Sequence, residues 1–125
     1  MTDGQEQHKR RWRFYKTASG SQPVHEFLAR LSTEDSEAVA SEMRVVAQRG
    51  LLLARHLRGD IYEVRADGET QSYRILFAAE GSYHHILLAL EAFSKKTQQT
   101  PPDKIRLAER RLKDWRERGR RLKQT

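Results

Sequence analysis

Three stretches of alternating apolar and polar residues in the second half of the chain constrain its fold more than any other feature. They cover residues 60–66, 72–78 and 85–94, with Asp67-Gly68 and Glu80-Gly81 between them. Alternation with a period of two is typical of strands that bury one face, and glycine-containing dipeptides between such runs favour tight hairpins. The pattern therefore predicts an antiparallel meander of three consecutive strands.

The first half of the chain has helical spacing instead. A short alternating run at residues 12–16 predicts one further strand, which we expect to join the sheet. Pro23 suits the first turn of a helix, and the apolar stripe behind it consists of Val24, Phe27, Leu28 and Leu31. Ser32, with Asp35 three residues later, predicts a capping box at the start of a second helix, which Gly50 ends.

A last helix is predicted after residue 100. Thr100 has the type and position of a cap, with Pro101 in the first turn and Asp103 completing a capping box. Its apolar stripe, which we expect to dock on the core side of the sheet, consists of Ile105, Ala108, Leu112 and Trp115. Gly119 is expected to stop it.

The predicted order is β-α-α-β-β-β-α, an α+β fold. An antiparallel sheet packs against an N-terminal helix hairpin and a C-terminal helix. The 125 residues suffice for one domain, which we place at 11–118. Residues 1–10 are expected to be a disordered tail, and residues 119–125 a basic tail.

Several classes of protein are excluded or disfavoured by composition. The chain has no cysteine, which excludes a disulfide scaffold, a thiolate zinc site and a cysteine nucleophile. Its five histidines lack metal-ligand spacing, so no metal or other cofactor is expected. No apolar run approaches the roughly 20 residues of a membrane span, and the polar N-terminus does not resemble a secretory signal. We therefore expect a cytoplasmic protein without a membrane partner.

The net charge of +7 is concentrated at one end of the chain. Residues 104–125 hold ten basic and three acidic residues, whereas residues 1–103 hold 14 of each. A one-sided basic segment favours a polyanionic partner such as nucleic acid or the ribosome. The alternative is a solvated, arginine-rich helix end.

The face of the sheet opposite the core is predicted to be unusually polar. Alternation places Tyr62, Val64, Leu90 and Ala92 with the core, and it places six other residues on the opposite face: Glu63, Arg65, Arg74, Glu91, Phe93 and Lys95. Lys96 follows at the strand end. Arginines match phosphates, and an aromatic ring can stack on a base, so this set suits RNA cleavage by the neighbouring 2′-hydroxyl. The alternative is a solvated face with two ion pairs, Glu63–Arg65 and Arg74–Glu91.

Three segments carry a resemblance to a known family. Residues 57–65 (LRGDIYEVR), 73–77 (YRILF) and 93–101 (FSKKTQQTP) closely resemble the HigB branch of the RelE/ParE toxin superfamily, which includes phage-derived relatives. The last of the three is the most specific, and the resemblance covers roughly residues 12–116. It implies a RelE-like fold and a toxin of a type II toxin–antitoxin system, an endoribonuclease that enters the ribosomal A site and cleaves mRNA there. It also implies a helix-turn-helix antitoxin of the HigA type as partner.

Roles follow from the resemblance by position. Arg65 and Arg74 are expected to bind phosphate, Lys95 and Lys96 to lie at the active-site end of the last strand, and Glu63 to be a motif carboxylate. Some relatives have a His or Tyr acid or base near that strand, where this chain has lysines. Lys95 and Glu91 are therefore the candidates for proton transfer. Glu91 is inferred only from its predicted position on the polar face, not from the resemblance.

Other functions stay open from the sequence. One alternative is a gyrase inhibitor like the ParE side of the superfamily, and another is a non-catalytic nucleic-acid-binding regulator. The last helix is expected to project a second basic surface toward ribosomal RNA or the antitoxin, consisting of Arg106, Arg110, Arg111 and Lys113.

Overall fold

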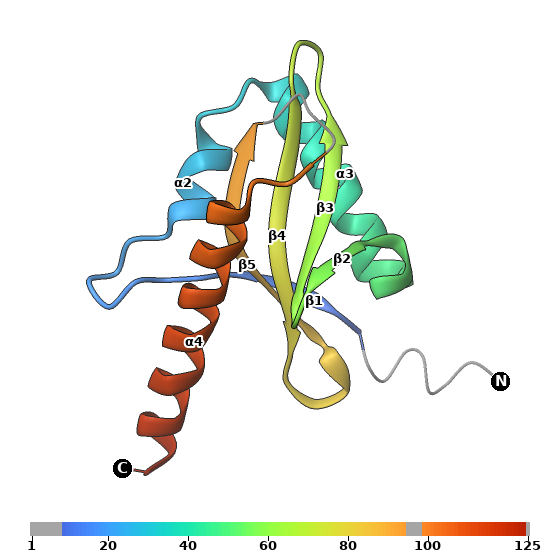
Figure 1. The fold of residues 1–125 in the computed structure, drawn as a ribbon. Coiled ribbons are helices and arrows are strands. Elements are labelled where there is room, and N and C mark those ends of the chain that lie inside the picture. The colour runs from blue at the N-terminus through green and yellow to red at the C-terminus, as the bar shows by residue number, and fades with distance from the viewer. Residues whose placement is uncertain (1–8, 95–98, 125) are drawn as a thin grey trace, which may run out of the picture.

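The computed structural model describes residues 9–94 and 99–124. The chain folds as a mixed α+β domain around a five-stranded sheet of order β1-β5-β4-β3-β2, with helices on both faces (Figure 1). The expected N-terminal tail falls mostly on residues 1–8, which lie outside the described residues. No helix in the described ranges has the length and apolar character needed to cross a membrane.

The predicted meander is confirmed. It consists of β3 (Ile61–Asp67), β4 (Ser72–Glu80) and β5 (Ile86–Ser94), paired antiparallel in chain order. The predicted first strand, β1 (Arg11–Phe14), joins the sheet beside β5. It runs parallel to β5, however, so the prediction of a wholly antiparallel sheet was wrong. Between β1 and β5 the chain passes through α2, α3 and strands β2 to β4, and a connection of this length permits parallel pairing.

A fifth strand was missed. β2 (Arg55–Arg58) pairs antiparallel with β3 at the sheet edge, and Gly59 turns the chain with a φ of 53°. Its sequence, RHLR, has three basic residues and no apolar alternation. Short, charged strands are common at sheet edges, where they discourage pairing with other chains. Strand β2 therefore lacks the alternating pattern by which a half-buried strand is predicted.

Helices α2 (Pro23–Ala29) and α3 (Thr33–Arg49) cover one face of the sheet. Ser32 caps α3 as predicted, because its hydroxyl accepts a hydrogen bond from the Asp35 amide at 3.1 Å. The Asp35 carboxylate does not complete a capping box. It accepts hydrogen bonds from the Tyr73 hydroxyl at 2.5 Å and the Glu69 amide at 2.9 Å. The start of α3 is thus fixed to the β3–β4 hairpin.

The C-terminal helix, α4 (Pro102–Gln124), packs on the opposite face of the sheet from α2 and α3 (Figure 1). The prediction that it docks on the core side shared with the other helices was wrong, although its stripe was identified correctly. Ala108 and Leu112 are buried against a second apolar set, with Ile105 and Trp115 partly buried beside them. This set includes Ile61, Leu76, Ala78, Leu88 and Leu90. The sheet therefore has two cores, one on each face.

Two further details of α4 differ from expectation. The helix continues through Gly119 to Gln124, so the predicted stop was wrong. A glycine inside a helix costs only about 1 kcal/mol relative to alanine, and the residues around it continue the helix. Thr100 does not cap the helix, which begins at Pro102; its hydroxyl bonds to residues of the sheet.

A β-bulge changes which side chains of β5 face α4. Leu76 pairs with Glu91, but the next residue, Phe77, pairs with Ala89, so Leu90 is an extra residue on β5. Leu90 and Glu91 consequently lie on the same face, toward α4. The predicted grouping of Leu90 with Ala92 was wrong, because alternation fails at a bulge.

Candidate active site

A cluster of charged and polar side chains lies on the α4 face of the sheet, around the buried carboxylate of Glu63. Its Oε1 accepts a hydrogen bond from Arg65 Nε at 2.7 Å, and its Oε2 accepts one from the Thr100 hydroxyl. Arg74 Nη1 donates to Thr100 Oγ1 at 3.1 Å and lies 3.7 Å from Glu63 Oε2. Strands β3 and β4 and the segment before α4 thus contribute to one network.

The two arginines of this network differ in accessibility. The Arg65 side chain is 30% exposed, whereas that of Arg74 is 4% exposed and the Glu63 side chain is fully buried. Burial lowers the pKa of the Arg74 guanidinium, and the neighbouring Arg65 and Arg55 lower it further, while Glu63 opposes both effects. Arg65 is therefore the more accessible arginine of this pair.

Arg74 corrects one expectation from the sequence. It does face away from the core around α2 and α3, as alternation predicts. It is nevertheless buried, and it donates a hydrogen bond to Thr100, just before α4. The side chain of Arg74 is therefore part of the packing between the sheet and the chain before α4, although the sequence places it on the polar face.

A second cluster adjoins the first on the same face. The Glu91 carboxylate lies 3.0 Å from Lys104 Nζ and 3.1 Å from Arg111 Nη1, and Arg111 also donates to the Leu90 carbonyl at 2.7 Å. Lys104 Nζ stands 5.3 Å from the centre of the Phe93 ring. Glu91 is 8% exposed and Phe93 is 7% exposed. The carboxylate is thus balanced by two cations, and the ring offers little open surface.

The basic surface of α4 is smaller than predicted. Arg106, Arg110 and Lys113 are exposed, as expected. The prediction that Arg111 joins them was wrong, because Arg111 faces the sheet and binds Glu91 and the Leu90 carbonyl. The backbone carbonyl released by the β-bulge at Leu90 supplies the partner that draws it inward.

Lys95 and Lys96 lie outside the described residues. Three other residues near the clusters were missed as site residues. Thr100 was interpreted only as a helix cap, and Lys104 was counted only in the charge of the helix. Arg55 was missed together with its strand; it pairs in register with Glu63. The sequence did hold a signal for Thr100, because it lies in residues 93–101, the segment with the most specific resemblance to the family.

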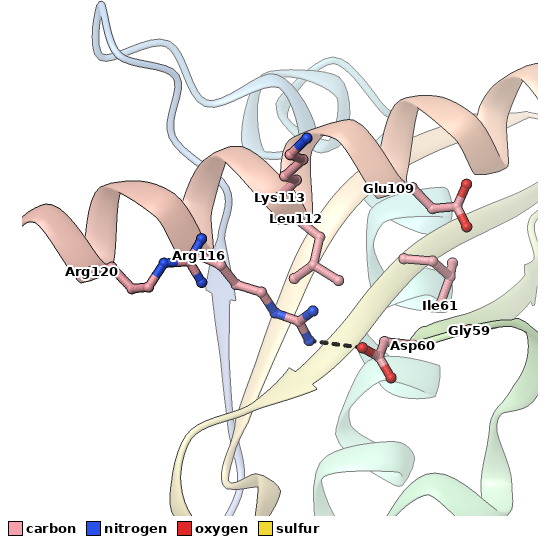
Figure 2. A pocket seen from close by; sticks show the side chains of 8 residues that line it. All are labelled: Gly59, Asp60, Ile61, Glu109, Leu112, Lys113, Arg116 and Arg120. Carbon is pink, nitrogen blue, oxygen red and sulfur yellow. Dashed lines mark hydrogen bonds and ion pairs between the residues drawn. The ribbon is translucent and has the colours of Figure 1, made fainter.

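A separate groove runs along the outer half of α4. It has a volume of about 410 Å³ and lies between α4 and the turn from β2 to β3 (Figure 2). Arg116 spans it, 3.0 Å from Asp60 and 2.7 Å from Glu80, and Arg58 binds Glu109 at 2.7 Å. These pairs attach α4 to the edge of the sheet. Carboxylates line this groove beside the cations, so it is less suited to a polyanion than the surface around Arg65.

Comparison with known proteins places these features in a family. Residues 26–113 match the family model described as phage-derived protein Gp49-like (DUF891). The chain is also 34% identical over 110 residues to the protein named "Probable endoribonuclease HigB1" from Mycobacterium tuberculosis strain CDC 1551 / Oshkosh. The protein of the same name from strain ATCC 25618 / H37Rv matches with the same identity. In each case the match covers 83% of this chain and 83% of the relative.

Proposed function

The chain belongs to the phage-derived Gp49-like protein family, and on this basis we propose that it is the toxin of a type II toxin–antitoxin pair, acting as an endoribonuclease. Its relatives in M. tuberculosis carry the name of an endoribonuclease. The observation that carries the proposal is the fixed pair of Glu63 and Arg65. A buried carboxylate holds a partly exposed guanidinium at 2.7 Å, which gives a cation pre-oriented for a phosphate.

The proposed substrate is mRNA on the ribosome. The 2′-hydroxyl next to the scissile bond loses its proton and attacks the phosphorus, and the 5′-oxygen leaves and gains a proton. The products are a 2′,3′-cyclic phosphate and a 5′-hydroxyl end. Arg65 stabilises the negative charge on the phosphorane oxygens, which is the role that electrostatic catalysis assigns to a fixed guanidinium. The nucleophile comes from the RNA itself, so we propose that the reaction needs no metal.

Arg74 acts through its neighbours in this proposal. The resemblance implies a phosphate-binding arginine at this position, but the side chain is buried behind Thr100 and Glu63. A positioning role fits these contacts better than a direct contact with the substrate. Arg74 and Thr100 hold the Glu63 carboxylate, and the carboxylate holds Arg65.

Proton transfer is assigned to Lys95, with Lys96 holding the RNA backbone. Glu91 was the other candidate for the proton. Each of its two carboxylate oxygens is engaged by a cation of α4, Oε2 by Lys104 and Oε1 by Arg111, so neither oxygen is open to a substrate. We propose that Glu91 instead positions Lys104 beside Phe93, at the edge of the site.

The ribosome supplies part of the catalysis in this account. Among the described residues of the two clusters, both carboxylates, Glu63 and Glu91, are already held by cations. Substrate geometry imposed by the ribosome must then contribute to the rate, since correct orientation alone can replace much of the barrier reduction. The proposed partners are therefore the ribosome with its mRNA and, for inhibition, a HigA-type helix-turn-helix antitoxin. The exposed Arg106, Arg110 and Lys113 form the proposed contact with ribosomal RNA.

Mapping the 5′ ends of cellular RNA after induction tests this function. A ribosome-dependent ribonuclease produces new 5′-hydroxyl ends within translated regions. A gyrase inhibitor of the ParE type leaves mRNA intact and causes DNA damage, and a non-catalytic regulator produces neither change. Either of the last two results overturns the proposal.

A further inference from the structure

A basic and aromatic pocket lies on the other side of the sheet from the candidate active site. It has a volume of about 520 Å³ and is formed by the end of α3, the short 3-10 helices η1 (Leu51–Leu53) and η2 (Ser82–His84), and strand β2. Its polar and aromatic lining consists of Arg10, Arg49, His56, Tyr62, Tyr83 and His84. No carboxylate is among the residues that line it within the described parts of the chain.

The backbone holds the aromatic side of this pocket in an uncommon conformation. Tyr83 and His84 have φ angles of 57° and 54°, in the left-handed region that residues other than glycine rarely adopt. Tyr83 is 73% exposed, and Leu52, which also lines the pocket, is 95% exposed. A large ring held in solvent by a costly turn suggests a functional constraint on its position.

The basic side of the pocket is formed by two arginines at the end of α3, Arg49 in the helix and Arg10 bound to it. Arg10 donates to the Ala47 carbonyl at 3.3 Å, and its guanidinium packs against Gly50, where an added Cβ would lie 2.8 Å from Nη2. Arg49 is exposed at the last residue of α3. Two guanidinium groups therefore face the same pocket as an exposed aromatic ring.

Strand β2 connects this pocket with the candidate active site across the edge of the sheet. Arg55 pairs in register with Glu63, and His56 pairs with Tyr62. Because successive side chains of a strand point to opposite faces, Arg55 lies on the face of the cluster around Glu63 and His56 lies on the face of the pocket. Both are exposed, so this edge of the sheet presents Arg55 on one face and His56 on the other.

We propose that this pocket is a second RNA subsite, which binds a single-stranded nucleotide next to the one that is cut. Its base stacks on Tyr83, and its phosphate lies against Arg49 and Arg10. The lining favours RNA because aromatic rings and arginines without acids are the usual elements of single-strand binding. The subsite extends the proposed ribonuclease function, on which its ligand class rests.

Binding of a short single-stranded RNA with 2′-O-methyl riboses tests the subsite without cleavage. The full chain is titrated against the labelled RNA at low and at physiological salt. Tyr83→Leu keeps an apolar side chain but loses the stacking surface, so it should weaken binding by about 5- to 100-fold. Tyr83→Phe should bind like the wild type. Arg49→Gln should weaken binding and reduce the log–log salt slope by about 0.7.

Arg44→Gln is the matched control, since Arg44 is exposed on the same helix but does not line the pocket. Circular dichroism confirms that each variant folds. Wild-type RNA affinity in both Tyr83→Leu and Arg49→Gln overturns the subsite, and so does an absence of RNA binding by the wild type at low salt. If these variants instead lose a protein partner while keeping RNA affinity, the pocket is a protein-docking site and the proposal is wrong. Ribosome-dependent cleavage is measured in a separate assay. The proposed ribonuclease function can therefore fail or hold independently of the result for this subsite.

Discussion

The hydroxyl of Thr100, two residues before α4, donates a hydrogen bond to the Oε2 of Glu63, which is buried in β3. The same hydroxyl accepts a hydrogen bond from Arg74 at 3.1 Å. The start of the C-terminal helix is therefore linked to β3 and β4 through the hydroxyl of Thr100. The Glu63 carboxylate also orients Arg65, so the docking of α4 and the geometry of the candidate site depend on each other.

Thr100→Val should lower both stability and activity. Valine keeps the shape of the side chain but leaves Glu63 and Arg74 each without one hydrogen-bond partner. Loss of a partner for a buried polar group costs about 1–3 kcal/mol, which urea unfolding can measure. Thr33→Val is a suitable control, because Thr33 is exposed at the start of α3. Equal unfolding midpoints for the two variants would argue against the network.

Arg74→Met should destabilise the protein strongly, by about 3–5 kcal/mol, because it leaves the buried Glu63 charge with less compensation. Loss of toxicity in this variant therefore reports on folding as well as on the site. The double variant Glu63→Leu/Arg74→Met should recover much of the stability but none of the activity. A double variant no more stable than Arg74→Met alone would contradict the proposed coupling.

The exposed basic surface of α4 should act through salt-dependent binding. The triple variant of Arg106, Arg110 and Lys113 to glutamine should weaken ribosome association at about 0.15 M salt and reduce the salt slope by about 0.7–0.9 per lost phosphate contact. The chemical step in bound complexes should hardly change. The same charge change at the exposed Lys16, Arg30 and Arg44 serves as the control. Identical slopes for both triple variants would show that the α4 charges are only solvated.

The link between α3 and the β3–β4 hairpin should depend on pH. The Tyr73 hydroxyl and the Glu69 amide hold the pKa of Asp35 below its ordinary value of 3.8. A lowered pKa in the folded state adds stability above the ordinary pKa, and this contribution is lost as the pH falls through the folded value. Tyr73→Phe should therefore lower the Tm more at pH 7 than near pH 2. An equal loss at both pH values would show that packing alone is affected.

The strands of the meander could be predicted because each buries a patterned face. The second core could have been suspected as well. Residues 75–79 of β4 (ILFAA) are all apolar, and a continuous apolar run is typical of a strand buried on both faces. Leu76 and Ala78 share the face of the polar Arg74, and α4 packs on them there.

Other features of the site have no signal in a single sequence. The bulge at Leu90 changes the facing of β5 in the middle of a regular pattern, and with it the partner of Arg111. The face of the sheet on which a side chain lies also does not determine how deeply that side chain is buried. Arg65 and Arg74 share a face, but the Arg65 side chain is 30% exposed and that of Arg74 only 4%. That difference depends on tertiary packing, which periodicity does not describe.

The central claim is that Arg65 stabilises the negative charge on the phosphorane oxygens when mRNA is cleaved on the ribosome. A reconstituted cleavage assay tests it most directly. Purified protein is mixed with ribosomes translating a defined mRNA, with a chelator present, and the new 5′-hydroxyl ends are quantified over time. Arg65→Gln should cut about 10²- to 10³-fold more slowly than the wild type. Arg13→Gln, an exposed change on the far edge strand, should cut at the wild-type rate. A folded Arg65→Gln protein that cuts as fast as the wild type would contradict the account.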